Sequence, residues 1–191
     1  MPAARAEYRP IETEHVRLVN CEIEGMSSDG GGTGMVSSHG NFTKLLGNRI
    51  HNSGENKFYH AIYWSDQGHD NELGWNHLYD VRGGRGIQTY DAGPGPFYNF
   101  SVHDNVVHDV DRDAMGFGGP STTGFKIFNN VVYRTGLGTS SCTDGECGNG
   151  DSSGIRLNTL LLEAEVYNNT LFDNQSDGGA FRLIGARILD G

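Results

Sequence analysis

The chain has 191 residues, of which 36% are hydrophobic, and its 14 basic and 24 acidic residues give a formal net charge of −10. A length of this order predicts a single domain, and the acidic balance argues against nucleic acid as a partner because no basic stripe offsets it. No apolar run approaches the length of a membrane-spanning segment, so a membrane partner is not expected either.

One motif recurs along the chain, in which an apolar segment leads into Asn, a variable residue and an aliphatic residue. The Asn position is occupied in chain order by Cys21, Asn48, Asn76, Asn105, Asn130 and Asn169. A second motif, a small residue followed by a large apolar one, begins in chain order at Gly34, Ala61, Gly86, Ala114, Gly154 and Ala180. The steps of both motifs are 25 to 29 residues, and both lengthen to 39 or 40 residues at the same place. The chain is therefore a repeat with one insertion.

The residues inside the repeat decide which class of repeat protein this is. A unit of this length occurs in leucine-rich repeats, helical repeats and β-solenoids. Apolar residues alternate, as at Phe100 and Val102 before Asn105, which is the two-residue period of a strand. Gly, Asn, Asp and Ser interrupt every possible helical stripe. The pattern predicts an all-β fold, a single-stranded right-handed parallel β-helix (a β-solenoid) of about six to seven coils stacked about 4.8 Å apart.

Three inward columns are expected to form the core. They consist of Thr43, Asn71, Phe100 and Phe125; of Leu45, Leu73, Val102, Ile127 and Val166; and of Ile50, Leu78, Val107, Val132 and Leu171. The recurring Asn is expected at a turn, in a backbone conformation that is costly for most residues, with stacked carboxamides forming an Asn ladder. The small residue of the second motif is expected at a tight corner where a Cβ would crowd the next coil.

The repeats divide the chain into a short extension and one domain. Residues 1–14 are expected to be an N-terminal extension or partial cap, and residues 15–191 the parallel β-helix domain, with an inserted loop at 137–153. Cys142 and Cys147 lie in that loop and are spaced so that they can pair, which would need an oxidising compartment. An extracellular or periplasmic location is expected, although residues 1–10 lack the hydrophobic centre of a signal peptide.

Rings are expected to stack along the outside of the coils. One column contains His51, Tyr79, His108, Tyr133 and Phe172, and another contains Leu46, His103, Phe128 and Tyr167. Ring stacking alone stabilises such columns, and the alternative is a surface that binds glycan or another subunit. Uncapped end coils predict either a fragment of a longer protein or a homo-oligomer that buries its ends or this stripe. His77 is expected in a different outward column from His51 and His108, which argues against a histidine metal site.

An outward face with sugar-binding chemistry is expected beside the second motif. Its columns are Val36, Tyr63, Gln88, Gly116, Arg156 and Arg182 and, two residues further on, Ser65, Tyr90, Gly118 and Asn158. Phenol rings stack on pyranose faces, guanidinium groups pair with carboxylates, and the glycines are expected to leave a depression. Asp66 and Asp91 fall at equivalent turns of adjacent coils, where two carboxylates share a proton, bind a hard cation such as calcium, or diverge into solvent. At the other edge of the face lie His60, Arg85, Arg112 and Asp113.

Four segments resemble the repeats of the pectate-lyase-like superfamily of right-handed parallel β-helix proteins. They are His60-Ala61-Ile62-Tyr63, Asn76-His77-Leu78-Tyr79-Asp80, Gly84-Arg85-Gly86-Ile87-Gln88 and Asp104-Asn105-Val106-Val107, within a likeness that covers about residues 16–183. The superfamily includes polysaccharide lyases, polygalacturonase-type hydrolases, uronate epimerases and phage tailspikes, so the resemblance implies a fold more specifically than a reaction. The Gly-His-Gly of the polygalacturonase type is absent from this chain.

The resemblance implies a carbohydrate-active protein that acts on or binds an acidic polysaccharide in a groove along the solenoid, by lyase-like β-elimination or by hydrolysis. The expected catalytic residues, which would move protons and neutralise developing charge, are His60, Arg112, Asp113 and Arg156. Substrate would be bound by Tyr63, Gln88, Tyr90 and Arg182, and calcium by Asp66 and Asp91. The alternatives are a non-catalytic glycan-binding or attachment module and a fragment of a larger β-helix enzyme.

Overall fold

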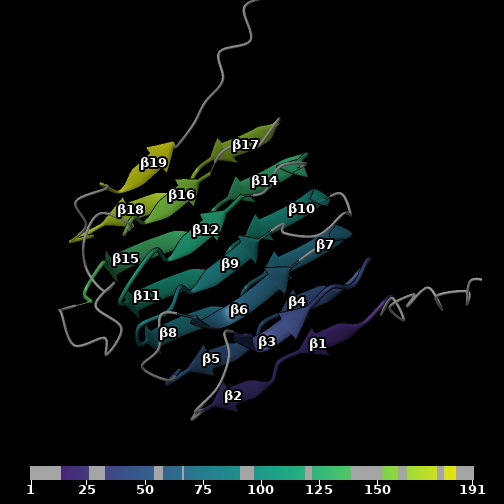
Figure 1. Cartoon of the computed structure of the whole chain (residues 1–191), viewed down its shortest axis with the longest axis horizontal. Helices are drawn as coiled ribbons and strands as arrows, with labels where there is room; N and C mark the ends of the chain where they lie inside the picture. The colour runs from purple at the N-terminus through teal and green to yellow at the C-terminus, as the bar shows by residue number, and fades with distance from the viewer. Residues whose placement is uncertain are drawn as a thin grey trace, which may run out of the picture.

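The strands lie in three parallel sheets (Figure 1). The computed structural model describes residues 14–25, 33–53, 58–65, 67–90, 97–118, 122–138, 152–158, 163–175 and 179–183. The first sheet contains β1 (Arg17–Val19), β4 (Lys44–Leu46), β7 (Gly68–Gly74), β10 (Phe97–His103), β14 (Phe125–Phe128) and β17 (Ala164–Tyr167), with β13 (Thr122–Thr123) paired to β10. The second contains β2 (Glu22–Glu24), β5 (Arg49–His51), β8 (His77–Val81), β11 (Val106–Val110), β15 (Val131–Thr135) and β18 (Thr170–Phe172). The third contains β3 (Thr33–Ser38), β6 (Tyr59–Ser65), β9 (Ile87–Tyr90), β12 (Met115–Phe117), β16 (Ile155–Leu157) and β19 (Phe181–Leu183).

The chain visits the three sheets in turn, so each winding adds one strand to each sheet. The pairings between successive windings are parallel, as between β1 and β4, β2 and β5, and β3 and β6. In Figure 1 the colour passes from purple to yellow from one end of the stack to the other, as expected when each winding lies on the one before. Within the described part of the chain there is no helix long and apolar enough to cross a membrane. The predicted all-β parallel solenoid is confirmed.

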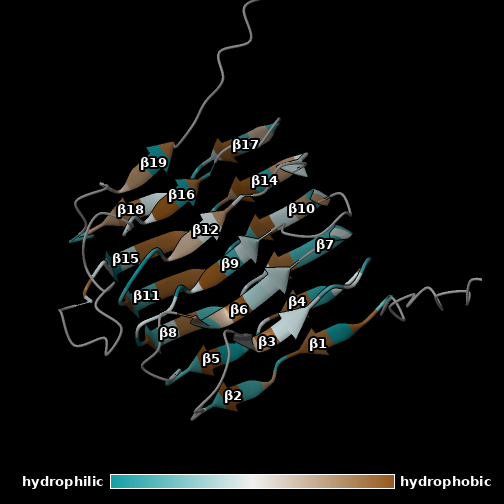
Figure 2. Ribbon diagram, viewed as in Figure 1, coloured by the Kyte–Doolittle hydropathy of each residue, from teal (hydrophilic) through white to brown (hydrophobic). Residues whose placement is uncertain are grey.

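Strand register confirms the predicted core columns. Leu45, Leu73 and Val102 lie opposite one another across β4, β7 and β10. In the second sheet Ile50 and Leu78 pair in the same way, and all five of these side chains are at most 2% exposed. Burial of each such side chain stabilises the fold by about 1.5–3 kcal/mol. Figure 2 shows hydrophobic and hydrophilic residues alternating along the strands, because one face of each sheet lines the core and the other faces outward.

The Asn ladder is confirmed as a continuous hydrogen-bonded column. The backbone N–H of Asn76 and its side-chain amide both donate to Oδ1 of Asn105, each at 2.9 Å. The side-chain amide of Asn105 in turn donates to Oδ1 of Asn130 at 3.0 Å and back to the carbonyl of Leu73 at 2.9 Å. The same pattern holds at the other rungs, and Cys21 starts the column by donating its N–H to Asn48. Buried carboxamides therefore satisfy backbone groups that the turn would leave unpaired.

The sequence predicted a left-handed backbone conformation at each ladder Asn. The structure places that conformation at the residue before it. This residue is Asn20, Gly47, Trp75, Asp104, Asn129 or Asn168, with φ between 52° and 65°. The bend is made one residue early because the ladder Asn must direct its own N–H at the next rung. Gly, Asn and Asp tolerate positive φ, whereas Trp75 is a bulky exception at a cost of about 1–2 kcal/mol.

The glycines of the second motif stand where successive windings approach closely, as predicted, whereas Ala61, Ala114 and Ala180 carry a Cβ at the equivalent position. A Cβ at Gly86 would lie 2.5 Å from the carbonyl oxygen of Ala114 in the next winding. A Cβ at Gly154 would lie equally close to the carbonyl oxygen of Ala180. These separations are below van der Waals contact, so the backbones could not keep their present spacing.

The first winding departs from the expected register by one residue. Val36 pairs with Ile62, and Ser37, not Val36, therefore lies opposite Tyr63. Met35 and Val36 both pack against the core, so alternation of faces does not decide which of the two aligns with Ile62. A slip of one residue moves every side chain of a strand to the other face.

Stacked rings cover the outside of the second sheet as predicted. His51 stacks on Tyr79 with ring centroids 4.7 Å apart, His108 stacks on Tyr133 at 4.6 Å, and Tyr133 stacks on Phe172 at 4.9 Å. Each of these pairs is within 11° of parallel. Offset ring pairs contribute about 0.5–1.5 kcal/mol each, so the stripe stabilises the stack. Its use as a surface for another subunit stays a prediction.

Candidate functional site

The third sheet places the predicted site residues in one column. Across β6, β9, β12, β16 and β19 the register aligns Tyr63, Gln88, Gly116, Arg156 and Arg182. The residue just before the small residue of each winding forms a second column. It contains His60, Arg85 and Asp113, because the N–H of Ala61 donates to the carbonyl of Arg85 and that of Gly86 to the carbonyl of Asp113. The two columns are neighbours on the same face.

The open depression expected on this face is filled. Gln88 and Arg156 are only 5% exposed. A Cβ at Gly116 would lie 3.0 Å from Oε1 of Gln88 and 3.2 Å from Cδ of Arg85, so these side chains fold over the glycine. Gly118 is covered in the same way by the Cβ of Asn158, 2.4 Å from the position of an added Cβ. The expectation of a depression was wrong because long polar side chains from neighbouring windings occupy the space that the glycines leave.

A buried carboxylate between two arginines lies at the centre of the face. Oδ2 of Asp113 accepts from Nε of Arg85 at 2.7 Å and lies 3.1 Å from Nη2 of Arg156. The Asp113 side chain is fully buried, and the side chains of Arg85 and Arg156 are 14% and 6% exposed. Oδ1 of Asp113 is buried without a hydrogen bond. A buried ion pair of this kind is sensitive to removal of either partner, because the remaining charge would be uncompensated.

His60 borders this cluster as a neutral ring. Its Nδ1 accepts the backbone N–H of Arg85 at 3.0 Å, which leaves the ring proton on Nε2. Burial, with the nearby charges of Arg85 and Arg112, lowers the pKa of His60 to about 3. Its ring centroid lies 5.3 Å from that of Tyr63. A histidine with so low a pKa is a weak proton acceptor near neutral pH.

The structure therefore brings together His60, Asp113, Arg156, Gln88 and Tyr63, and adds Arg85, which had been placed at the edge of the face without a role. Of the other predicted residues, Arg112 acts on His60 through its charge, and Arg182 lies opposite Arg156 at the end of the column. Tyr90 stands in the next column, opposite Ser65, and is 53% exposed. Asp66 and Asp91, the expected calcium ligands, lie outside the described residues, as do Cys142 and Cys147.

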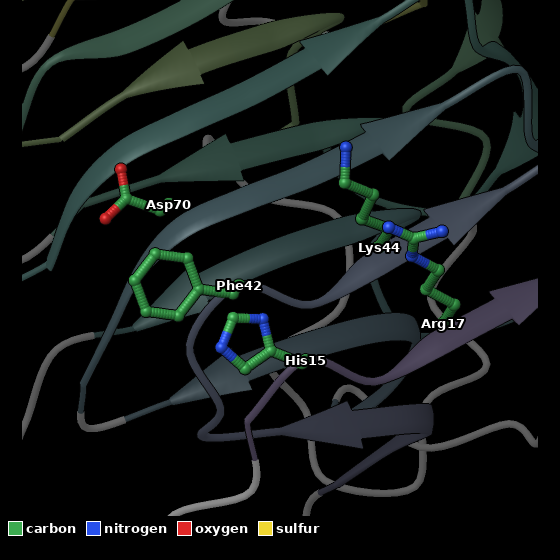
Figure 3. Close-up of a pocket in the computed structure, with 5 residues that line it drawn as sticks. All are labelled: His15, Arg17, Phe42, Lys44 and Asp70. Atoms are coloured by element: carbon green, nitrogen blue, oxygen red, sulfur yellow. The ribbon is translucent and has the colours of Figure 1, made fainter.

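A pocket of about 500 Å³ lies on the first sheet, where the sequence had suggested no site. It is lined by His15, Arg17, Phe42, Lys44 and Asp70, from three successive windings (Figure 3). The rings of His15 and Phe42 stack with centroids 4.7 Å apart and planes 8° from parallel. Figure 3 shows Arg17 and Lys44 side by side next to this ring pair, and the register pairs the same two residues.

Local backbone geometry exposes the aromatic part of the pocket. His15, Phe42 and Asp70 have φ of 57°, 51° and 54°, so each stands at a left-handed corner. Phe42 also makes a T-shaped contact with His69, with ring centroids 5.0 Å apart, and the Phe42 residue stays 37% exposed. Lys44 pairs with Glu72, while no described residue pairs with the guanidinium of the exposed Arg17. The repeat in the sequence could have revealed this pocket, since His15, Phe42 and Asp70 are spaced by one period and therefore fall at equivalent corners.

Comparisons of the chain with protein-family models, with curated proteins and with solved structures found no match. The resemblance to the pectate-lyase-like superfamily therefore stays a prediction, and the function must be argued from the two sites above. Within the described ranges no group of three or more His, Cys, Asp or Glu side chains could hold a metal ion.

Proposed function

We propose that this chain is a glycan-binding β-solenoid whose ligand is an acidic polysaccharide. The observation that carries the proposal is the pocket on the first sheet, where a stacked aromatic pair stands beside the exposed cation Arg17. Lys44 is a second cation, paired with Glu72, and Asp70 adds one carboxylate to the lining. A flat ring packs against the apolar face of a pyranose, and a guanidinium pairs with a uronate carboxylate. An extracellular or periplasmic location suits such a ligand.

The pocket has the accessibility that binding requires. Phe42 and Arg17 reach solvent, whereas Arg85 and Arg156 of the third sheet are largely covered. Phe42 is also held in place by two ring neighbours, His15 and His69, so binding would cost little side-chain entropy. Because the chain as a whole carries a charge of −10, a polyanion must be drawn by these local cations, and its binding should weaken with salt.

Catalysis on the third sheet is a second candidate function. It is favoured by the buried Asp113, with one carboxylate oxygen lacking a hydrogen bond, beside a histidine whose pKa is strongly lowered. Perturbed titratable groups cluster at active sites, although structural ion pairs also produce them. In a lyase or hydrolase, Arg85 and Arg156 would neutralise the substrate carboxylate, and calcium at Asp66 and Asp91 would assist. This function requires the cluster to become accessible to a sugar.

The decisive experiment measures retention and calorimetric binding of the chain on polygalacturonate and alginate, with neutral polymers of equal length as reference. Arg17→Gln and Phe42→Ala should each weaken binding by about tenfold, the effect of losing roughly 1.4 kcal/mol. Lys126→Gln is the matched control, since Lys126 is an exposed cation of the same sheet that makes only a distant pair with Glu165 at 3.8 Å. Equal binding by all variants would exclude the pocket.

The same polymers, with and without calcium, test the second candidate. Unsaturated product seen by ultraviolet absorbance, or new reducing ends, would establish lyase or hydrolase chemistry and direct attention to the Asp113 cluster. Binding without either product selects the glycan-binding module. Neither binding nor product on any acidic polymer would overturn both functions.

A further inference from the structure

Two histidines of the second sheet meet side chain to side chain. Nε2 of His77 on β8 lies 2.8 Å from Nε2 of His108 on β11, with ring centroids 5.0 Å apart. Their strands are neighbours in the sheet (Figure 1). The register pairs His77 with Val106 and His108 with Tyr79, so the two residues stand in different columns, as expected from the sequence. The side chains nevertheless converge, because imidazole rings are long enough to reach a diagonal neighbour.

Asp109 orients the Nε2 lone pair of His108 toward this meeting point, where Nε2–H of His77 donates to it. A bound ion would therefore replace that proton, and His77 would carry its proton on Nδ1. Nδ1 of His108 lies 2.6 Å from Oδ2 of Asp109, and since a carboxylate only accepts hydrogen bonds, Nδ1 carries the proton. The lone pair of His108 is then on Nε2, which faces His77. Arg134 binds the same carboxylate, so Asp109 is held as an orienting group for the ring. A carboxylate behind the far nitrogen of a histidine is the usual second partner of a metal ligand.

We infer that His77 and His108 form a two-histidine chelate for a divalent transition metal, with Cu²⁺ favoured over Ni²⁺ and Zn²⁺. Imidazole nitrogen is a preferred ligand of these ions, and Cu²⁺ heads the affinity series. Metal–nitrogen bonds of about 2.0–2.1 Å at cis or tetrahedral angles separate the two nitrogens by about 2.9–3.4 Å. The rings need to part by only a few tenths of an ångström to accept the ion.

The residues around the two histidines determine how an ion enters, how it is coordinated and how tightly it binds. His77 is exposed, so an ion can enter from solvent without unfolding the chain. The rings of Tyr79 and Tyr133 stack on the two sides of His108 and hold it in place. The described residues offer no third His, Cys, Asp or Glu ligand, so water or a group from another molecule completes the coordination. The positive charge of Arg49, hydrogen-bonded to Tyr79, opposes cation binding and keeps the affinity moderate.

The test is calorimetric titration of the full chain with Cu²⁺, together with electron paramagnetic resonance to count coordinating nitrogens. His77→Gln and His108→Gln should each remove one equivalent of Cu²⁺ and the two-imidazole spectrum. Asp109→Asn keeps both rings and should weaken binding by about 10-fold to 100-fold. The matched control is His69→Gln. His69 has the same arrangement, with Nδ1 2.7 Å from Asp70 and its ring stacked on Tyr98, but no second histidine is bonded to it.

The possible results distinguish the two-histidine chelate from other copper sites. Loss of one equivalent in both site variants, with wild-type binding in His69→Gln, supports the chelate. Equal Cu²⁺ binding by wild type, His77→Gln, His108→Gln and His69→Gln, or an equal loss in His69→Gln, overturns it and assigns the ion to other groups. Circular dichroism verifies that each variant is folded. The exposed His77→Gln variant alone decides the question if the His108 variant does not fold.

Discussion

Replacing Asn105 by Ala tests whether the Asn ladder stabilises the solenoid. Asn105 is fully buried in the middle of the column, and its side chain takes part in four hydrogen bonds. The substitution leaves two buried backbone groups without these partners, the N–H of Asn76 and the carbonyl of Leu73. The methyl group that remains cannot replace either bond.

The expected loss follows from the number of unsatisfied groups. Each buried donor or acceptor left without a partner costs about 1–3 kcal/mol, so the two groups together cost about 2–6 kcal/mol. A loss near the middle of that range is a large part of the 5–15 kcal/mol that is typical of a whole domain. Urea unfolding followed by far-ultraviolet circular dichroism measures it, with the slope against urea checked for constancy.

Two further variants calibrate the result. Asn129→Gly, at an exposed position with φ of 56°, should change stability by no more than about 0.5 kcal/mol. Asn169→Ala, at the half-buried end of the ladder, should cost less than Asn105→Ala because water can reach the freed groups. A loss below about 1 kcal/mol for Asn105→Ala, or equal losses along the ladder, would refute the reasoning.

The other predictions concern the corner, the ion cluster and its histidine. Gly86→Ala should destabilise by about 1–3 kcal/mol in urea unfolding, because the new Cβ would lie 2.5 Å from the carbonyl oxygen of Ala114. Asp113→Asn should destabilise by about 3–5 kcal/mol, since it removes the buried carboxylate charge that contacts both Arg85 and Arg156. Stability should fall as pH drops from 6.5 toward 3, by up to about 1.4 kcal/mol per pH unit from His60.

The sign of the pH effect follows from proton uptake. In the unfolded chain His60 binds a proton below its ordinary pKa of 6.5, whereas in the folded chain it stays neutral down to a pKa of about 3. The unfolded state therefore binds more protons within that window, and acid favours it. Because carboxylates titrate in the same range, the quantity to measure is the difference between wild type and His60→Asn. Parallel stability curves for the two proteins would contradict the assignment. For Gly86→Ala and Asp113→Asn, a urea unfolding midpoint equal to that of wild type would contradict the predicted destabilisation.

The fold was readable from the sequence because every winding repeats the same physical requirements. A ladder Asn, an apolar residue two positions later and a small corner residue recur at one period, and each needs its counterpart directly above and below. Periodicity thus determined the strands, the core columns and the ladder without any knowledge of tertiary contacts. It failed at the first winding, where Val36 and not Met35 takes the position opposite Ile62.

The sites depended on side-chain directions that the repeat does not encode. The sequence placed Arg156 and Asp113 on one face, but only the packed structure shows them buried against each other with Arg85 folded over Gly116. His77 and His108 likewise stand in different columns, and only their side-chain directions bring them together. The sequence by itself determined which residues share a column, since backbone register is set by period. Tertiary structure alone decided which side chains are open to solvent and which meet, because long side chains cross between columns to satisfy charge and to fill space.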